Sequence, residues 1–133
     1  MAAKVWGVSP QEYMRKADVW PLNPNGEILL GVKIEDKFAY ANVNEIVRVP
    51  GLAFGEGGPG DMGLSFGFKP GDPKAKEVQD KIFAAAKAQH LYWLGIGGDE
   101  AAIAQSIKDG HMVGSGEQTA AIGRRITKRP QPY

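Results

Sequence analysis

Residues 27–34 read EILLGVKI, a nearly continuous apolar run in a chain of 133 residues. The run lacks the strict alternation of apolar and polar residues that marks a half-exposed strand. Continuous runs of this length are typical of strands that are buried on both faces of a parallel sheet. We therefore predict a buried strand here and look to its flanking segments for further strands and their crossover helices.

Helix and strand signals alternate along the chain around this run. Ser9 and Pro10 begin a helix that should end before Pro21, and Asp72 and Asp99 are good N-caps for two later helices. Further helices are predicted at about residues 37–47, 72–89, 99–108 and 117–126, and further strands at 52–54, 91–96 and 111–115. Strands that alternate with helices in this way form right-handed βαβ units and a parallel sheet.

Four βα units predict an α/β fold, namely half of a TIM-type (β/α) barrel, with residues 1–133 as a single domain. A whole barrel typically needs about 250 residues. The competing architecture is a flavodoxin-like layer, which carries a phosphate loop after its first strand. Residues 34–37 contain no glycine, so the sequence favours the barrel.

The composition excludes several classes of protein. Hydrophobic residues make up 43% of the chain, charged residues 23%, and the net charge is +1, which gives no reason to expect nucleic acid as a partner. No apolar run approaches the roughly 18 residues that span a bilayer, and we see no secretory signal. The absence of cysteine excludes disulfides and thiolate metal sites. We expect a cytoplasmic protein with no membrane partner.

A glycine-rich stretch follows the second predicted strand. Residues 55–60 (GEGGPG) match the pattern G-x-G-x-x-G, but Pro59 and the expected lack of a helix directly afterwards argue against dinucleotide binding. The stretch is better interpreted as a loop that shapes a pocket for a metal and a carboxylate, because glycine lets the backbone approach a ligand closely.

Two carboxylates stand at the carboxyl ends of neighbouring predicted strands, where barrel enzymes have their active sites. Glu35 ends the first strand, and Asp61 lies in the loop after the second. Neighbouring strands are about 4.8 Å apart, so both side chains can reach one ion. Such hard oxygen ligands favour Mg²⁺ or Mn²⁺. The structural alternative is that Glu35 pairs with a lysine and Asp61 caps a turn.

Several segments resemble the HpcH/HpaI aldolase family. Residues 32–37 (VKIEDK), 41–46 (ANVNEI) and 50–52 (PGL) are similar, in this order, to a passage of the family that contains a metal-binding Glu. Residues 58–67 (GPGDMGLSFG) are similar to the family's metal loop, and GDP at residues 71–73 follows in the family's order. The resemblance covers nearly the whole chain and implies the C-terminal half of the family's barrel.

The resemblance implies a divalent-metal-dependent carbon–carbon lyase that cleaves or forms 4-hydroxy-2-oxo acids through the enolate of pyruvate. Glu35 and Asp61 would hold the Mg²⁺ or Mn²⁺ ion. The backbone N–H groups of Gly60 and Asp61 would receive the carboxylate of pyruvate, and an aldehyde would be the second substrate. The family's general-base His and its Arg lie in the N-terminal half, so no catalytic residue is assigned in this chain.

The sequence also departs from the family. Lys33 stands where the family usually has Gln, and we expect its ammonium group to pair with Glu35 or to contact substrate. Glu56 adds a carboxylate, interpreted mainly as a solvated loop residue and alternatively as a group behind the metal ligands. His90 and His111 flank the amino-terminal side of predicted strands, at the end of the barrel that serves stability, and are interpreted as structural.

Other functions remain open on the sequence. The chain could be a non-catalytic barrel remnant or oligomerisation module, or a CoA-ester lyase of the same superfamily. A half-barrel has unpaired parallel edges, here expected at residues 28–34 and 111–115, and unpaired edges invite association. We therefore expect a homo-oligomer or a complementing half-barrel, and poor aldol cleavage by the chain alone.

Overall fold

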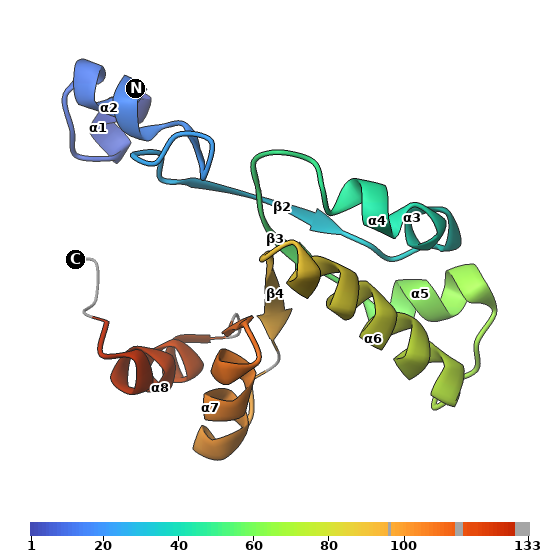
Figure 1. Cartoon of the computed structure of the whole chain (residues 1–133). Coiled ribbons are helices and arrows are strands. Elements are labelled where there is room, and N and C mark those ends of the chain that lie inside the picture. The colour runs from blue at the N-terminus through green and yellow to red at the C-terminus, as the bar shows by residue number, and fades with distance from the viewer. Residues whose placement is uncertain (96, 114–115, 130–133) are drawn as a thin grey trace.

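The computed structural model describes residues 1–95, 97–113 and 116–129 (Figure 1). Short helices and strands alternate through this part of the chain. In order they are α1 (Ala2–Val5), α2 (Pro10–Lys16), β1 (Val19–Trp20), β2 (Ile28–Lys33), α3 (Lys37–Ala41), α4 (Val43–Ile46), β3 (Leu52–Glu56), α5 (Pro59–Phe66), α6 (Pro73–Ala88), β4 (Tyr92–Gly95), α7 (Glu100–Lys108), β5 (His111–Val113) and α8 (Gly116–Thr127). Residues 114 and 115 of the predicted last strand, and residue 96 of the one before it, lie outside the described residues.

The five strands form one sheet whose spatial order, β1-β2-β3-β4-β5, is the order of the chain. Every neighbouring pair is parallel. Right-handed crossovers between strands that advance in one direction place the connecting helices on one face of the sheet. A flavodoxin-like layer would instead reverse direction at a switch point. The predicted α/β fold with a parallel sheet is confirmed, and the described strands have the sequential order of a (β/α) barrel.

The first strand was not expected from the sequence. The helix predicted to end before Pro21 ends at Lys16, and β1 occupies Val19–Trp20 between them. The N–H of Glu27 donates to the Lys16 carbonyl at 2.8 Å, and the N–H of Ile28 donates to the Asp18 carbonyl at 3.1 Å. These parallel-strand bonds outweigh local helix propensity, and they make β1, rather than β2, an edge of the sheet.

Two helical predictions also change. The single helix expected at residues 37–47 is divided at Asn42, whose side-chain amide donates to the Phe38 carbonyl at 2.9 Å. The glycine-rich stretch is not only a loop, because α5 begins at Pro59. Proline suits the first helical position, since its missing N–H needs no partner there. The expected absence of a helix directly after residues 55–60 is therefore wrong, because α5 begins within this stretch and continues to Phe66.

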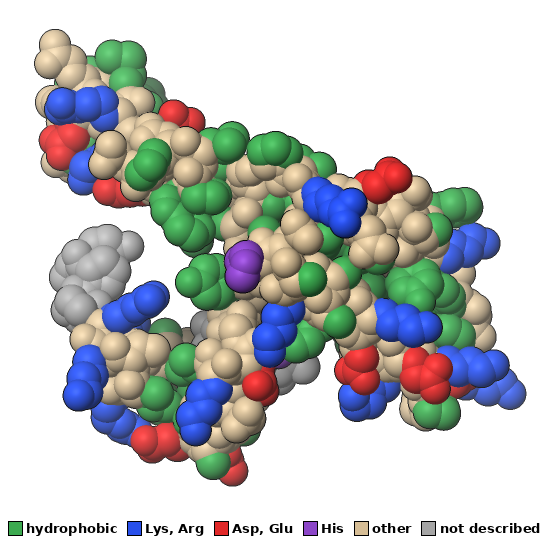
Figure 2. Space-filling view, in the orientation of Figure 1, with side chains coloured by type: hydrophobic (Ala, Val, Ile, Leu, Met, Phe, Trp, Pro, Cys, Tyr) green, Lys and Arg blue, Asp and Glu red, His purple; other side chains and the backbone are tan. Residues whose placement is uncertain are grey.

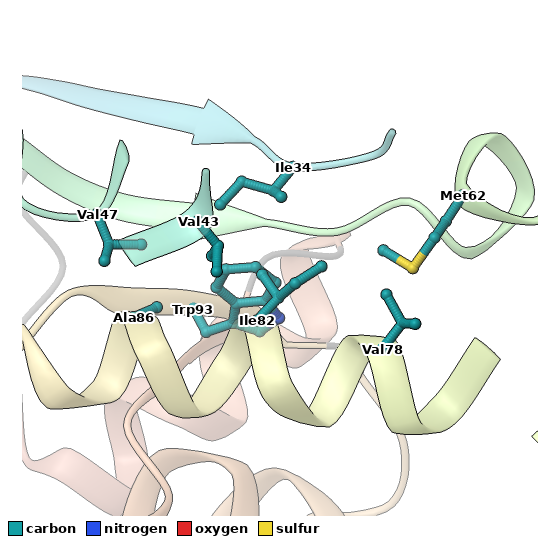
Figure 3. Packing of buried hydrophobic residues seen from close by; sticks show 8 residues of the cluster. All are labelled: Ile34, Val43, Val47, Met62, Val78, Ile82, Ala86 and Trp93. Atoms are coloured by element: carbon teal, nitrogen blue, oxygen red, sulfur yellow. The ribbon is translucent and has the colours of Figure 1, made fainter. Parts of the chain in front are cut away.

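The hydrophobic core lies between the sheet and helices α4, α5 and α6 (Figure 3). Val78, Ile82 and Ala86 recur every fourth residue on α6 and form one buried stripe. They pack with Ile34, which follows β2, and with Trp93 of β4, and these two side chains are 1% and 8% exposed. The core therefore sits beneath the carboxyl ends of β2 and β3, where the predicted site lies.

The amino-terminal half of β2 departs from the predicted burial on both faces. Ile28, Leu29 and Leu30 are 39%, 47% and 45% exposed, whereas Ile34 is 1% exposed. The helices that cover β2 pack near its carboxyl end, so the first three residues of the strand lie beyond the core. Figure 2 shows hydrophobic side chains at the surface in this part of the molecule. The first part of the apolar run, at residues 28–30, is thus a surface feature of the chain as described.

Candidate metal and carboxylate site

Glu35 is held at the carboxyl end of β2 by its neighbours in the chain. The N–H of Ile34 donates to the Glu56 carbonyl at 2.8 Å, which joins the end of β2 to the end of β3. Asp36 caps α3, since its carboxylate accepts from the N–H groups of Phe38 and Ala39 at 2.7 and 2.9 Å. Of these two adjacent carboxylates, Asp36 is engaged in capping, and Glu35 is left to face the end of the sheet.

Asp61 is placed by helix α5. It lies in the first turn of the helix, and the next residue, Met62, is 1% exposed and anchors the helix in the core. The hydroxyl of Ser65 accepts from the N–H of Lys37 at 3.0 Å, so α5 is also tied to the start of α3. The loops after β2 and β3 are thereby fixed to each other.

The two predicted ligands converge at Gly58. A Cβ atom built on Gly58 would overlap Oε1 of Glu35 and would lie 3.3 Å from Oδ2 of Asp61. Both carboxylate oxygens therefore lie within 3.3 Å of one point, and only a glycine leaves that point free. The sequence shows a glycine-rich stretch here, but no pattern in it distinguishes Gly58 as the residue that leaves the space between the carboxylates.

Lys33 lies beside this pair. Its Nζ is 3.1 Å from Oε1 of Glu35 and 4.0 Å from Oε2 of Glu56. Hydrogen bonding to Glu35 and the charge of Glu35, followed by the charges of Glu56 and Asp61, raise the pKa of Lys33, so the ammonium group stays charged. The approach of Nζ is nevertheless poorly directed, and Oε1 is buried without a well-aligned donor among the described residues. The contact is therefore best described as an ion pair.

Glu56 is part of the sheet. It is the last residue of β3 and the register partner of Lys33 across the β2–β3 pair. Its side chain is 36% exposed. Its interpretation as a solvated loop residue is therefore wrong, because it lies in a strand. The sequence signal that could have placed it is its position directly after the apolar residues 52–55, where a strand can extend by one residue.

The donor set fits a hard divalent cation that keeps part of its water shell. Mg²⁺ is commonly bound through one or two carboxylates together with waters and substrate oxygens. Glu35 and Asp61 supply two such carboxylates, and the buried Oε1 of Glu35 borders the space at Gly58. In the part of the chain that the structure describes, no three His, Cys, Asp or Glu side chains are grouped to hold a metal. A dinucleotide phosphate is disfavoured here, because it would meet both carboxylates.

The two histidines lie away from this end of the sheet. His90 precedes β4, and His111 is the first residue of β5. The His111 ring packs against Phe83 with ring centroids 4.5 Å apart, and its Nδ1 is buried without a partner among the described residues. Their predicted structural role remains a prediction. Within the described chain, the carboxyl ends of the strands present no histidine.

A groove elsewhere on the molecule was not expected from the sequence. A groove of about 660 Å³ runs between the first strands and α8, and Figure 2 shows the hollow between these elements. Leu29 and Tyr92 line its apolar wall, and Arg124 and Arg129 stand on the side of α8. The groove lies apart from Glu35 and Asp61, which are not among its lining residues.

Comparison with known proteins gives matches among solved structures. A macrophomate synthase superposes with a TM-score of 0.58 at 22% identity, over 68% of this chain and 32% of that protein. An HpcH/HpaI aldolase from Desulfitobacterium hafniense DCB-2 gives 0.55 at 24% identity, over 80% and 45%. A variant of the citrate synthase SbnG gives 0.58 at 18% identity, over 89% and 54%. No family model and no curated protein matches the chain.

These likenesses show the fold. The chain spans about a third to about a half of the length of the solved proteins that it matches. None of the described helices has the length and apolar character that a membrane crossing requires. The chain has the parallel α/β fold found in an HpcH/HpaI aldolase, and the resemblance predicted from the sequence is confirmed as a likeness of fold.

Proposed function

We propose that this chain supplies the metal-binding part of a divalent-metal-dependent carbon–carbon lyase of the aldolase type, acting on 4-hydroxy-2-oxo acids. The observation that carries the proposal is the convergence of Glu35 and Asp61 on the space left by Gly58. The likeness of fold to an HpcH/HpaI aldolase supports the reaction class. The chain would then act as half of a (β/α) barrel, and pyruvate and an aldehyde would be the substrates.

Each residue of the site has a defined task in this proposal. Glu35 and Asp61 would hold Mg²⁺ or Mn²⁺, and the ion when bound supplies a Lewis acid for the negative charge that develops on a 2-oxo acid. The backbone N–H groups of Gly60 and Asp61 lie in the first turn of α5, whose N-cap, Gly58, has no side chain to cap them. Unsatisfied N–H groups and the helix dipole favour a carboxylate at this position. The ammonium group of Lys33 would add positive charge near the carboxylate of a substrate bound at this position.

The proposed chemistry also needs a general base, and the histidine that the family resemblance implies for this role is not present at this end of the described sheet. His90 and His111 both lie at the amino ends of strands. We therefore expect the chain alone to bind the ion and a 2-oxo acid but to cleave 4-hydroxy-2-oxo acids poorly. A CoA-ester lyase would use the same two carboxylates, and it would differ from an aldolase in the part of the barrel that this chain does not supply.

The test of this function measures thermal unfolding with Mn²⁺, alone and together with pyruvate or oxalate. We expect Mn²⁺ to raise the unfolding midpoint and oxalate to raise it further, because ligands that bind only the folded state stabilise it by about 2.7 kcal/mol at 100 times their dissociation constant. Glu35→Ala should abolish both shifts. Glu77→Ala, an exposed carboxylate on α6, should retain them. Equal shifts in the Glu35→Ala and Glu77→Ala variants would refute the proposed site.

The exposed apolar half of β2 supports self-association with a second copy of the chain. Ile28, Leu29 and Leu30 form an exposed apolar row along β2 whose side chains alternate between the two faces of the strand, and within the described sheet β1 and β5 each present one unpaired parallel edge. The chain spans 45% of the HpcH/HpaI aldolase and 54% of the SbnG variant. Two copies would therefore provide about as much chain as one such protein, which supports the proposal that the second copy complements the first.

Sedimentation velocity at micromolar concentration tests this association. We expect the chain to sediment as a dimer or larger species, and Leu29→Lys to shift it towards monomer, because the substitution places a charge in the apolar row. Leu64→Lys is the matched control, since Leu64 is 84% exposed on α5 and lies outside that row. A well-folded monomer of the unmodified chain would contradict the proposal.

A further inference from the structure

One oxygen atom of the candidate site borders both the proposed position of the divalent ion and the ammonium group of Lys33. Glu35 Oε1 is the oxygen that borders the space at Gly58, and it is also the oxygen that lies 3.1 Å from Nζ of Lys33. Mg²⁺ binds carboxylate oxygens at about 2.1 Å. An ammonium group and a divalent ion on the same oxygen would repel each other strongly, so one of the two must give way.

Lys33 has a second carboxylate within reach. Glu56 is its register partner across β2–β3, and Glu56 Oε2 is already 4.0 Å from Nζ. The side chain of Lys33 is 56% exposed, whereas that of Glu35 is 21% exposed. A lysine side chain with this exposure can rotate about its torsions without disturbing the core, while Glu35 is held next to the buried Ile34. Lys33 is therefore the group that moves.

We propose that Lys33 is a tethered cation that neutralises Glu35 when no divalent ion is bound and transfers to Glu56 when one binds. Glu56 is then a positioning residue, because it acts on the ion by drawing the ammonium group away from Glu35. This inference rests on the proposed metal site and adds a regulation of its affinity. The carboxylates of Glu35, Glu56 and Asp61 and the ammonium group of Lys33 together carry a double negative charge. A single divalent ion balances this charge, so the site is neutral in the ion-bound arrangement.

The two residues should have opposite effects on affinity. Lys33→Gln removes the competing cation, and we expect it to tighten the binding of Mn²⁺ by about 10-fold, because like charges a few ångströms apart near a protein surface repel each other by at least this order of free energy. Glu56→Gln removes the alternative partner of Lys33, and we expect it to weaken binding by about 10-fold. In the Lys33→Gln background the Glu56→Gln change should cost much less, because no ammonium group remains to be moved.

Isothermal titration of the chain with Mn²⁺ alone measures this double-mutant cycle. Lys37→Gln is the matched control, because its Nζ lies over the Phe38 ring at 5.3 Å and within 4.0 Å of no carboxylate in the described chain. We expect it to bind Mn²⁺ as the unmodified chain does. Lys33→Met, which keeps the apolar stem of the side chain, should tighten binding as Lys33→Gln does, and melting curves without metal verify that each variant folds.

The outcomes separate this inference from the function on which it rests. Unchanged affinity in Lys33→Gln and Lys33→Met would overturn the tethered-cation role and leave the metal site standing. An equal effect of Glu56→Gln in both backgrounds would show that Glu56 acts only through its own charge, which overturns the transfer. No Mn²⁺ binding by any variant, including those that lack the Lys33 charge, would overturn the metal site itself.

Discussion

Gly58→Ala is expected to weaken the binding of a divalent cation by about 10- to 100-fold while the chain remains folded. The added Cβ would overlap Oε1 of Glu35 and approach Oδ2 of Asp61, so both carboxylates would have to turn away from their common point. The backbone of Gly58 has φ −89° and ψ 109°, which alanine adopts without strain. Titration with Mn²⁺ measures the affinity directly.

Gly63→Ala is the control for this prediction. Gly63 lies in the same helix, and a Cβ there would meet only the Phe68 carbonyl oxygen at 3.8 Å, an ordinary contact. Alanine in a helix interior is favoured over glycine by up to about 1 kcal/mol, whereas alanine at the N-cap position of Gly58 costs about 1 kcal/mol. Affinity for Mn²⁺ should be unchanged in Gly63→Ala. Equal affinity in the Gly58→Ala variant would show that the two carboxylates do not share an ion.

Ile82→Ala should lower the free energy of unfolding by about 2–5 kcal/mol. Ile82 is fully buried on α6, in the cluster that joins this helix to Ile34 and Trp93. Removal of its larger side chain would leave a cavity beneath the carboxyl end of β2, because the surrounding side chains relax only in part. Urea unfolding followed by circular dichroism measures the loss, and a domain of this size has only about 5–15 kcal/mol to lose.

Leu64→Ala provides the comparison for Ile82→Ala. Leu64 is 84% exposed on α5, so its truncation should change the free energy of unfolding by no more than about 0.5 kcal/mol. Mn²⁺ binding should survive in both variants at low temperature, since neither side chain supplies an oxygen ligand to the ion. A loss in Ile82→Ala as small as that in Leu64→Ala would contradict the packing of α6 against the sheet.

The longer helices could be predicted from the sequence because their signals are local. Asp72 with Pro73 marks the start of α6, and Asp99 marks the start of α7, where its carboxylate accepts from the N–H of Ala102 at 2.8 Å. The strand β1 could not be predicted in this way, because two residues carry almost no periodicity and its hydrogen bonds come from a distant segment. Helix α5 was missed because its glycines oppose a helix locally, while the burial of Met62 stabilises it in the folded chain.

The candidate site was predictable as far as strand topology determines it. Parallel strands that are neighbours in the chain bring their carboxyl ends together, and this predicts that Glu35 and Asp61 lie at the same end of the sheet. The division of roles between Glu35 and Asp36 depends on which carboxylate caps α3, and the sequence does not decide this. The approach of Lys33 to Glu35 was one of two expected contacts, and the pairing of Lys33 with Glu56 required the register of β2 and β3.

The sequential order of the strands has a consequence for how the chain folds. Residues 33–61, which contain both carboxylates and Gly58, join strands that are adjacent along the chain as well as in space. Closing such a short loop costs little entropy, and proteins rich in local contacts fold quickly. The pieces of the binding site should therefore come together as a local unit of the chain, and a cation that binds them would stabilise the folded arrangement of this unit.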